Sequence, residues 1–132
     1  MPSQEILPMR GDEPPALLIV DDDRDICLNL RDIFAELGYV ADVAGDGVAA
    51  LEMAQQRRYR VALVDYKMPG MDGAALLDRM RQVSPSTRPI MITAHAMQPE
   101  FDPIARDQPY PILPKPIDVR RLVPLVEKAL NE

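Results

Sequence analysis

The chain has 132 residues, of which 47% are hydrophobic, and it carries a formal net charge of -6. That length and apolar content suit one domain with a packed core, and the negative charge argues against direct nucleic-acid binding, which needs clustered Lys and Arg. Because the longest aliphatic run, residues 16–20, cannot span a bilayer and the single cysteine, Cys27, cannot form an internal disulfide, we expect a cytoplasmic protein without membrane contact.

The first fifteen residues contain four prolines and no hydrophobic periodicity, so we expect residues 1–15 to form a flexible leader. The folded domain should then occupy residues 16–132. From Ala16 onward, short apolar runs alternate with segments of helical periodicity. The apolar runs predict five strands, at residues 17–20, 40–44, 61–64, 90–92 and 112–113.

Helical segments follow the first three runs and the last one. The first should end at Gly38, which suits a left-handed C-terminal cap. Asp46 is placed to cap a second helix that extends to about Arg57, Asp72 to cap a third, and Asp118 to precede the last. The chain's tight basic cluster falls at the expected end of the second helix, where cations suit the helix dipole: Arg57, Arg58 and Arg60.

Prolines crowd the last third of the chain, with six between the fourth strand and the last helix and Pro124 inside that helix. An interior proline costs ~3 kcal/mol of helix propensity, so we expect a short or broken fourth helix and a kinked last helix. The fifth strand should lie at a sheet edge, where missing N–H donors are tolerated. The alternation of strands and helices predicts an α/β fold with a doubly wound, five-stranded parallel sheet.

Polar residues follow four of the predicted strands, at the end where doubly wound sheets place their sites. Asp21 and Asp22 follow the first strand, Asp65 the third, Thr93 the fourth and Lys115 the fifth. These ends share one edge of a parallel sheet, and carboxylates that meet there repel one another unless a cation neutralises them. Oxygen ligands favour a hard cation, so Mg²⁺ is the physiological candidate.

An acidic Mg²⁺ pocket beside a lysine and a hydroxyl suggests phosphoryl transfer, with Asp65 as the nucleophile. Lys115 and Thr93 would contact the phosphoryl oxygens. Each residue alone has a simpler explanation: aspartates are common at a helix N-terminus, threonine at a strand end and lysine on a solvated surface. Their placement after four different strands favours the functional interpretation.

Four segments carry these residues in chain order: LLIVDDDRDI, ALVDYKMPGMDG, PIMITAH and LPKP. Together they resemble the receiver domains of bacterial two-component response regulators, over about residues 16–131. The resemblance implies a strand order of 2-1-3-4-5 and transfer of a phosphoryl group onto Asp65 from a histidine kinase or a histidine phosphotransfer protein. It also implies a switch acting on an output protein or domain. Such a switch catalyses its own phosphorylation and dephosphorylation and turns over no external substrate.

The resemblance assigns the metal ligands residue by residue. Asp22 and the Asp65 carboxylate resemble the direct Mg²⁺ ligands, and Asp21 resembles the carboxylate that acts through water. The backbone carbonyl of Lys67 resembles a further ligand.

The remaining pocket residues also have counterparts in the family. Thr93 resembles the hydroxyl that follows the phosphoryl group during switching, and Lys115 the cation that pairs with it. The peptide bond from Lys115 to Pro116 is expected to be cis. His95 falls at a position that flanks the family's pocket, although a solvated loop histidine is the simpler interpretation.

Ile112 departs from the family pattern, since receivers usually carry an aromatic switch residue at this position. A β-branched side chain offers fewer rotamers than a swinging ring. We therefore expect signalling to proceed by ordering or shifting of residues 97–111.

Two other classes stay open. A phosphatase of the haloacid dehalogenase type also forms a metal-assisted aspartyl phosphate, but it carries an Asp two residues after its nucleophile, where this chain has Lys67. A degenerate receiver that only binds protein is the second alternative, and the complete acidic set disfavours it.

Overall fold

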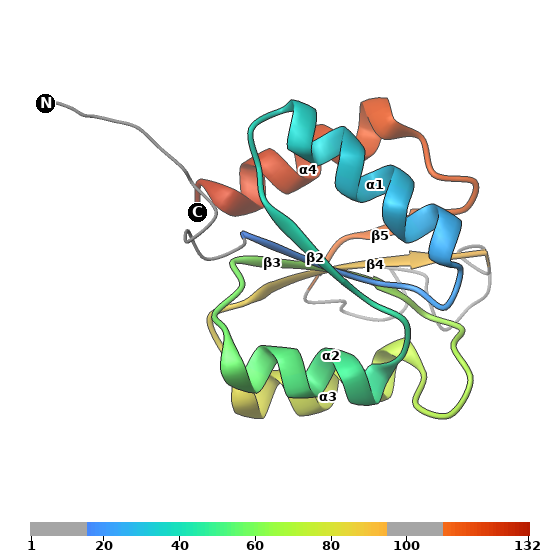
Figure 1. Ribbon diagram of the computed structural model, residues 1–132, viewed down its shortest axis with the longest axis vertical. Helices are drawn as coiled ribbons and strands as arrows, with labels where there is room; N and C mark the ends of the chain where they lie inside the picture. The colour runs from blue at the N-terminus through green and yellow to red at the C-terminus, as the bar shows by residue number, and fades with distance from the viewer. Residues whose placement is uncertain (1–15, 95–109) are drawn as a thin grey trace, which may run out of the picture.

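The structure is a computed structural model that describes residues 16–94 and 110–132. Five parallel strands form one sheet in the order β2-β1-β3-β4-β5: β1 (Leu17–Val20), β2 (Ala41–Ala44), β3 (Val61–Asp65), β4 (Arg88–Thr93) and β5 (Ile112–Pro114). Within the described residues, the helices are α1 (Arg24–Glu36), α2 (Gly47–Gln56), α3 (Gly73–Val83) and α4 (Val119–Leu130). Figure 1 shows α1 and α4 over one face of the sheet and α2 and α3 over the other. The predicted fold class and strand order are confirmed.

β4 begins at Arg88, two residues before the predicted start, because it accommodates Pro89. Successive strand residues direct their N–H groups to opposite sides, and Arg88 donates toward β3, to the Arg60 carbonyl at 2.9 Å. Pro89 would therefore donate toward β5, which pairs with β4 only from Met91 onward. The missing N–H falls where β5 has not yet begun. β5 itself lies at the edge of the sheet, as expected from its prolines.

Aspartates cap all four of these helices, because a carboxylate accepts N–H groups that have no partner in the first helical turn. Two of the caps, Asp46 and Asp72, were predicted from the sequence, and Asp118 precedes the last helix as expected. The expected left-handed cap after α1 is also confirmed, since Gly38 has a φ of 92°. Its N–H donates to the Ala35 carbonyl at 3.0 Å, which ends the helix.

α4 corresponds to the predicted last helix and runs from Val119 to Leu130 with Pro124 inside it. The proline therefore does not end the helix, and the kink expected there stays a prediction. The predicted fourth helix and His95 fall within residues 95–109, outside the described residues, as does most of the expected switch segment. The predicted leader, residues 1–15, lies outside them as well.

The core has one layer on each face of the sheet, because consecutive strand residues point to opposite faces. Leu17 and Ile19 pack toward α1 and α4, while Leu18 and Val20 pack toward α2 and α3, and all four are buried. Cys27 is buried in the first layer. Among the described residues, no helix combines the length and apolar character that crossing a membrane would need.

A buried tyrosine and an arginine join α2 to the edge of the sheet where the strands begin, here called the amino edge. The Tyr59 hydroxyl donates to Asp42 Oδ2 of β2 at 2.6 Å, and the Arg57 guanidinium donates to the same oxygen at 2.7 Å. Burial and the neighbouring Asp42 carboxylate raise the pKa of Tyr59, so its hydroxyl stays a donor. These bonds fix the end of α2 against β2.

Two further arginines hold the end of α4 at the same edge. The Arg60 guanidinium donates to the Leu130 carbonyl, and Arg88 pairs with Glu132 at 3.2 Å. The basic cluster was predicted to lie at the end of the second helix, and Arg57 does lie at the end of α2. Arg60, from the same cluster, instead binds the end of α4. Both arginines belong to the sheet region, so the last helix is tied to the strands it covers.

Candidate functional site

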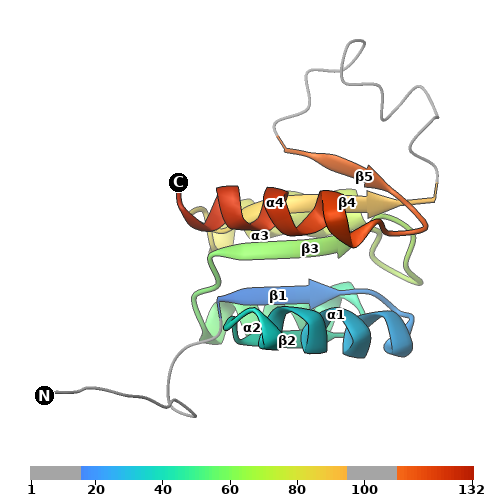
Figure 2. The ribbon, with the colours of Figure 1, turned by 90° about the horizontal axis from the view of Figure 1, so that it is seen from above.

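Three carboxylates meet at the opposite edge of the sheet, its carboxyl edge, where the strands end. Asp21 and Asp22 follow β1, and Asp65 is the last residue of β3. Because Val20 pairs in register with Val64, the residues that follow them, Asp21 and Asp65, lie next to each other. One oxygen from each of the three carboxylates lies within 4.8 Å of the others. Figure 2 shows β1, β3 and β4 ending on the same side of the molecule.

The aspartates after β1 divide between two roles. Asp23 is the cap of α1, and its Oδ1 accepts the N–H groups of Asp25 and Ile26. Asp21 is only 4% exposed, and its Oδ1 accepts the Asp23 N–H at 2.9 Å. Asp22 is exposed. The simpler interpretation of these residues, as helix caps, therefore holds for Asp23 alone.

Lys115 reaches the carboxylates from the end of β5. Its ammonium lies 3.1 Å from Asp21 Oδ2 and 3.4 Å from Asp65 Oδ2. The backbone N–H of Lys115 donates to the Thr93 carbonyl at 2.9 Å, which ties the lysine to the end of β4. The peptide bond to Pro116 is cis, as the resemblance implies.

Thr93 ends β4 at the same edge, where it is fully buried and paired with Pro114. The neighbouring Ile92 carbonyl accepts the Tyr66 N–H at 2.9 Å, which fixes the ends of β3 and β4 relative to each other. Lys67 follows in the connection to α3, with an exposed side chain. The use of its carbonyl as a metal ligand stays a prediction.

Charges in the pocket do not balance. Burial, and then the neighbouring Asp21 carboxylate, raise the pKa of Asp65 to about 6, although the Lys115 ammonium opposes the shift. Burial would lower the pKa of Lys115, but its hydrogen bond to Asp21 and the two carboxylate charges outweigh burial and raise it. Among residues 16–94 and 110–132, three carboxylates thus face one ammonium, and these groups carry two uncompensated negative charges when all are ionised.

The donor set fits a hard divalent cation. Carboxylate oxygens are the ligands that Mg²⁺ prefers, and a charge of two neutralises the excess. Cys27 is close by, but its thiol donates to the Asp21 backbone carbonyl at 3.2 Å. Burial, followed by the Asp21 charge, raises the pKa of Cys27 to about 11, so no thiolate is present at neutral pH to attract a soft metal. No sequence pattern signals this bond, because it depends on how α1 packs on β1.

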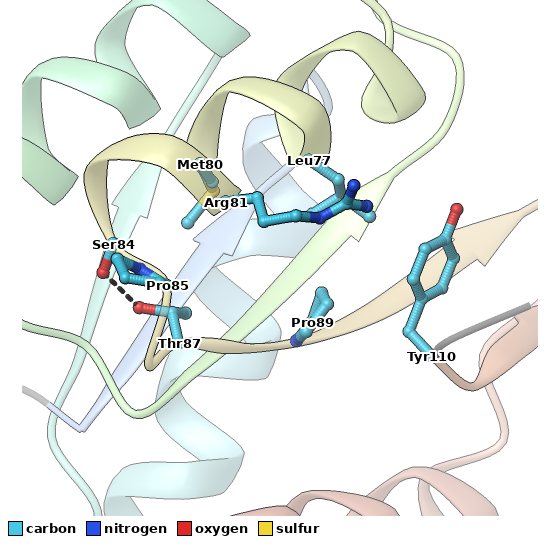
Figure 3. A pocket seen from close by; sticks show the side chains of 8 residues that line it. All are labelled: Leu77, Met80, Arg81, Ser84, Pro85, Thr87, Pro89 and Tyr110. Atoms are coloured by element: carbon cyan, nitrogen blue, oxygen red, sulfur yellow. Dashed lines mark hydrogen bonds between the residues drawn. The ribbon is translucent and has the colours of Figure 1, made fainter.

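A separate small cavity, of about 150 Å³, lies between α3 and β4. Figure 3 shows the side chains that line it: Leu77, Met80, Arg81, Ser84, Pro85, Thr87, Pro89 and Tyr110. The Thr87 hydroxyl gives its proton to the Tyr59 carbonyl at 2.7 Å, so Ser84 must donate in the 2.5 Å bond between the two hydroxyls. These hydroxyls therefore hold the start of β4 in place. Both are engaged in hydrogen bonds within the protein, so the cavity does not resemble the carboxylate site.

Gly73, the first residue of α3, borders the carboxylate site. Its N–H donates to the Tyr66 carbonyl at 2.7 Å, and its Cα faces the Asp65 carbonyl. One sequence signal could have pointed to Gly73: it directly follows the capping Asp72, at a helix start where most residues have a higher helix propensity than glycine.

The chain is similar to known proteins over most of its length. A family model described as "Response regulator receiver domain" matches residues 17–127. The response regulator receiver protein Anae109_2439 of Anaeromyxobacter sp. (strain Fw109-5) is 36% identical over 82% of this chain, which spans 45% of that relative. Sporulation initiation phosphotransferase F of Bacillus subtilis (strain 168) is 34% identical, with 86% of this chain and 92% of the relative covered.

Solved structures agree. A CheY-like receiver domain protein from Methanospirillum hungatei JF-1 superimposes with a TM-score of 0.80 at 27% identity, covering 90% of this chain and 95% of that one. The response regulator TrrA from Thermotoga maritima, in complex with Mg(2+)-BeF, has a TM-score of 0.73 at 26% identity, covering 86% and 96%. These matches are to receiver domains and so favour the receiver interpretation over the haloacid dehalogenase alternative. Since the family match spans every residue of the carboxylate site, from Asp21 to Lys115, this chain belongs to the response regulator receiver domains.

Proposed function

We propose that this receiver domain accepts a phosphoryl group on Asp65 from a histidine kinase or a histidine phosphotransfer protein, with Mg²⁺ as its cofactor. One observation carries the proposal: the carboxylates of Asp21, Asp22 and Asp65 meet within 4.8 Å, beside the ammonium of Lys115. This donor set suits both a divalent cation and a transferring phosphoryl group.

In the proposed reaction, a carboxylate oxygen of Asp65 attacks phosphorus. The new P–O bond forms as the bond from phosphorus to the donor histidine nitrogen breaks, and that nitrogen leaves with the electron pair. Mg²⁺, held by the three aspartates and the Lys67 carbonyl, would supply positive charge to the phosphoryl oxygens. Lys115, 3.4 Å from Asp65 Oδ2, is placed to pair with one phosphoryl oxygen, and the Thr93 hydroxyl is assigned to another.

The ionisation of Asp65 suits this role. With a pKa of about 6, its carboxylate is mostly ionised at neutral pH and is more basic than an ordinary aspartate. Attack of water on the aspartyl phosphate would return the domain to its starting state. We place this cycle in the cytoplasm, where it would switch an output protein or domain.

Labelling by radioactive acetyl phosphate tests the proposal without a cognate kinase. We expect Mg²⁺-dependent labelling of the wild type and none of Asp65→Asn. Asp78→Asn provides the control, because this carboxylate lies on α3 with its side chain 76% exposed, and we expect it to be labelled like the wild type. Labelling of Asp65→Asn at the wild-type rate under native conditions would show that the acceptor is another residue.

A further inference from the structure

We infer that Gly73 is a positioning residue for phosphorylation: because it has no side chain, α3 begins directly against the backbone of Asp65 and Tyr66, and this contact fixes where the Asp65 carboxylate lies. The inference rests on the proposed function, since it concerns the same acceptor. Gly73 has no side chain with which to contact a phosphoryl group or a metal, so its effect would pass through Asp65.

The contact leaves no room for a Cβ atom. A Cβ at Gly73 would lie 2.6 Å from the Asp65 carbonyl oxygen, 2.8 Å from Tyr66 Cα and 3.2 Å from the Asp65 carbonyl carbon. Nonbonded carbon contacts are most favourable at about 3.5–4.0 Å. All three atoms belong to the main chain at the end of β3, so no side-chain rotation can relieve the overlap. Either α3 or the backbone of Asp65 would have to move.

Conformational freedom does not explain the glycine. Gly38 and Gly70 adopt positive φ values, of 92° and 80°, but Gly73 does not. Glycine in a helix is less favourable than alanine by about 1 kcal/mol. On helix propensity alone, alanine would therefore serve better at the first position of α3. The close approach to Asp65 is what requires glycine there.

Hydrogen bonds join this contact to the reacting carboxylate. The Gly73 N–H donates to the Tyr66 carbonyl at 2.7 Å, and the Tyr66 N–H donates to the Ile92 carbonyl at 2.9 Å. The backbone that carries Asp65 is thus held between α3 and β4. A shift of this backbone would move the Asp65 carboxylate relative to Lys115, which approaches from a different strand. A misplacement of ~1 Å at a reacting centre can cost about 100-fold in rate.

Gly47 offers a matched control within the same chain. It begins α2 after the capping Asp46, as Gly73 begins α3 after Asp72, and both glycines are buried. The three atoms nearest to a Cβ at Gly47 all belong to the Met71 side chain, with 3.0 Å to both Cβ and Sδ. The Met71 Cγ and Sδ atoms can move by side-chain rotation, and the fixed Met71 Cβ lies at 3.0 Å, so the overlap is milder than the 2.6 and 2.8 Å approaches to backbone atoms at Gly73. Gly47→Ala should therefore disturb packing at a helix start and leave the backbone of Asp65 in place.

The test compares Gly73→Ala and Gly47→Ala in the full chain. Labelling by acetyl phosphate is measured at saturating Mg²⁺ and divided by the folded fraction from circular dichroism. We expect Gly73→Ala to lower this rate roughly 10- to 100-fold and Gly47→Ala to stay close to the wild type. In amide correlation spectra, Gly73→Ala should displace the Tyr66 resonance, whereas Gly47→Ala should mainly affect residues around Met71.

Wild-type labelling per folded molecule in Gly73→Ala, or an equal loss in Gly47→Ala, would overturn the inference and leave the proposed function intact. If Gly73→Ala is unfolded in buffer, the same comparison is made in trimethylamine N-oxide, which favours the compact state. Absence of labelling in the wild type would overturn the proposed function and this inference with it.

Discussion

Replacing Asp65 by asparagine should stabilise the metal-free domain at neutral pH, although it removes the proposed acceptor. Burial and Asp21 raise the pKa of Asp65 from its ordinary value of 3.8 to about 6. At about 1.36 kcal/mol per pKa unit, ionised Asp65 destabilises the folded state by roughly 3 kcal/mol. Asparagine does not ionise. Allowing for an imperfect fit of its amide beside Lys115, we expect a gain of about 2 kcal/mol, or roughly 5–10 °C in Tm.

The stability gained by Asp65→Asn should increase as pH rises, because the pKa of Asp65 is raised in the folded state. Between pH 3.8 and about 6, the folded state binds more protons at Asp65 than the unfolded state does. Wild-type stability therefore falls as pH rises through this window, whereas Asp65→Asn escapes that loss. The difference between the two proteins should be small below about pH 4 and complete above about pH 7.

Urea unfolding followed by circular dichroism in EDTA, from about pH 4 to about pH 8, measures this difference. Asp78→Asn, which removes an exposed carboxylate, should show no comparable gain. Adding Mg²⁺ should stabilise the wild type more than Asp65→Asn, because the cation binds the intact acidic cluster better. A variant that is less stable than the wild type at neutral pH in EDTA, or a difference that does not change with pH, would refute the reasoning.

Three further predictions concern the two edges of the sheet. Mg²⁺ affinity should fall as pH drops below about 6, because protonated Asp65 is a poor ligand, and constant affinity by titration calorimetry down to about pH 5 would contradict this. Lys115→Met should lower acetyl phosphate labelling by at least about tenfold. It should raise Mg²⁺ affinity, because the ammonium that competes for Asp21 is gone. A loss of both labelling and Mg²⁺ affinity would indicate a disrupted pocket. Tyr59→Phe removes the hydrogen bond to Asp42 and should cost about 1 kcal/mol in urea unfolding with labelling unchanged, so a labelling defect would argue against separate roles for the two edges.

The meeting of Asp21, Asp65, Thr93 and Lys115 could be predicted from the sequence because it follows from topology. Each residue follows an apolar run, at once or after one proline, and parallel strands end at a shared edge. The distances could not be predicted: the Lys115 ammonium lies closer to Asp21 than to Asp65, which depends on side-chain packing across three strands.

Other details depend on contacts that no local pattern encodes. Proline is usually excluded from the inside of a central strand, but Pro89 fits inside β4 because its missing N–H faces the side where β5 has not begun. Only the relative offset of β4 and β5 in the structure shows this. The thiol of Cys27 bonds to Asp21 because α1 packs on β1. The need for glycine at residue 73 comes from the distance between two backbones.

The hydrogen bonds and ion pairs of the amino edge have a consequence for how this domain can change. A strand of four to six residues separates them from the carboxylates, which is roughly 13–20 Å, and substitutions farther apart than about 7–10 Å usually have additive effects on stability. Stabilising substitutions near Arg60 or Arg88 should therefore offset destabilising ones at the carboxylate site without altering its chemistry. In directed evolution, the amino edge is the place to strengthen the domain first, before the pocket is varied toward a new phosphodonor or a longer-lived aspartyl phosphate.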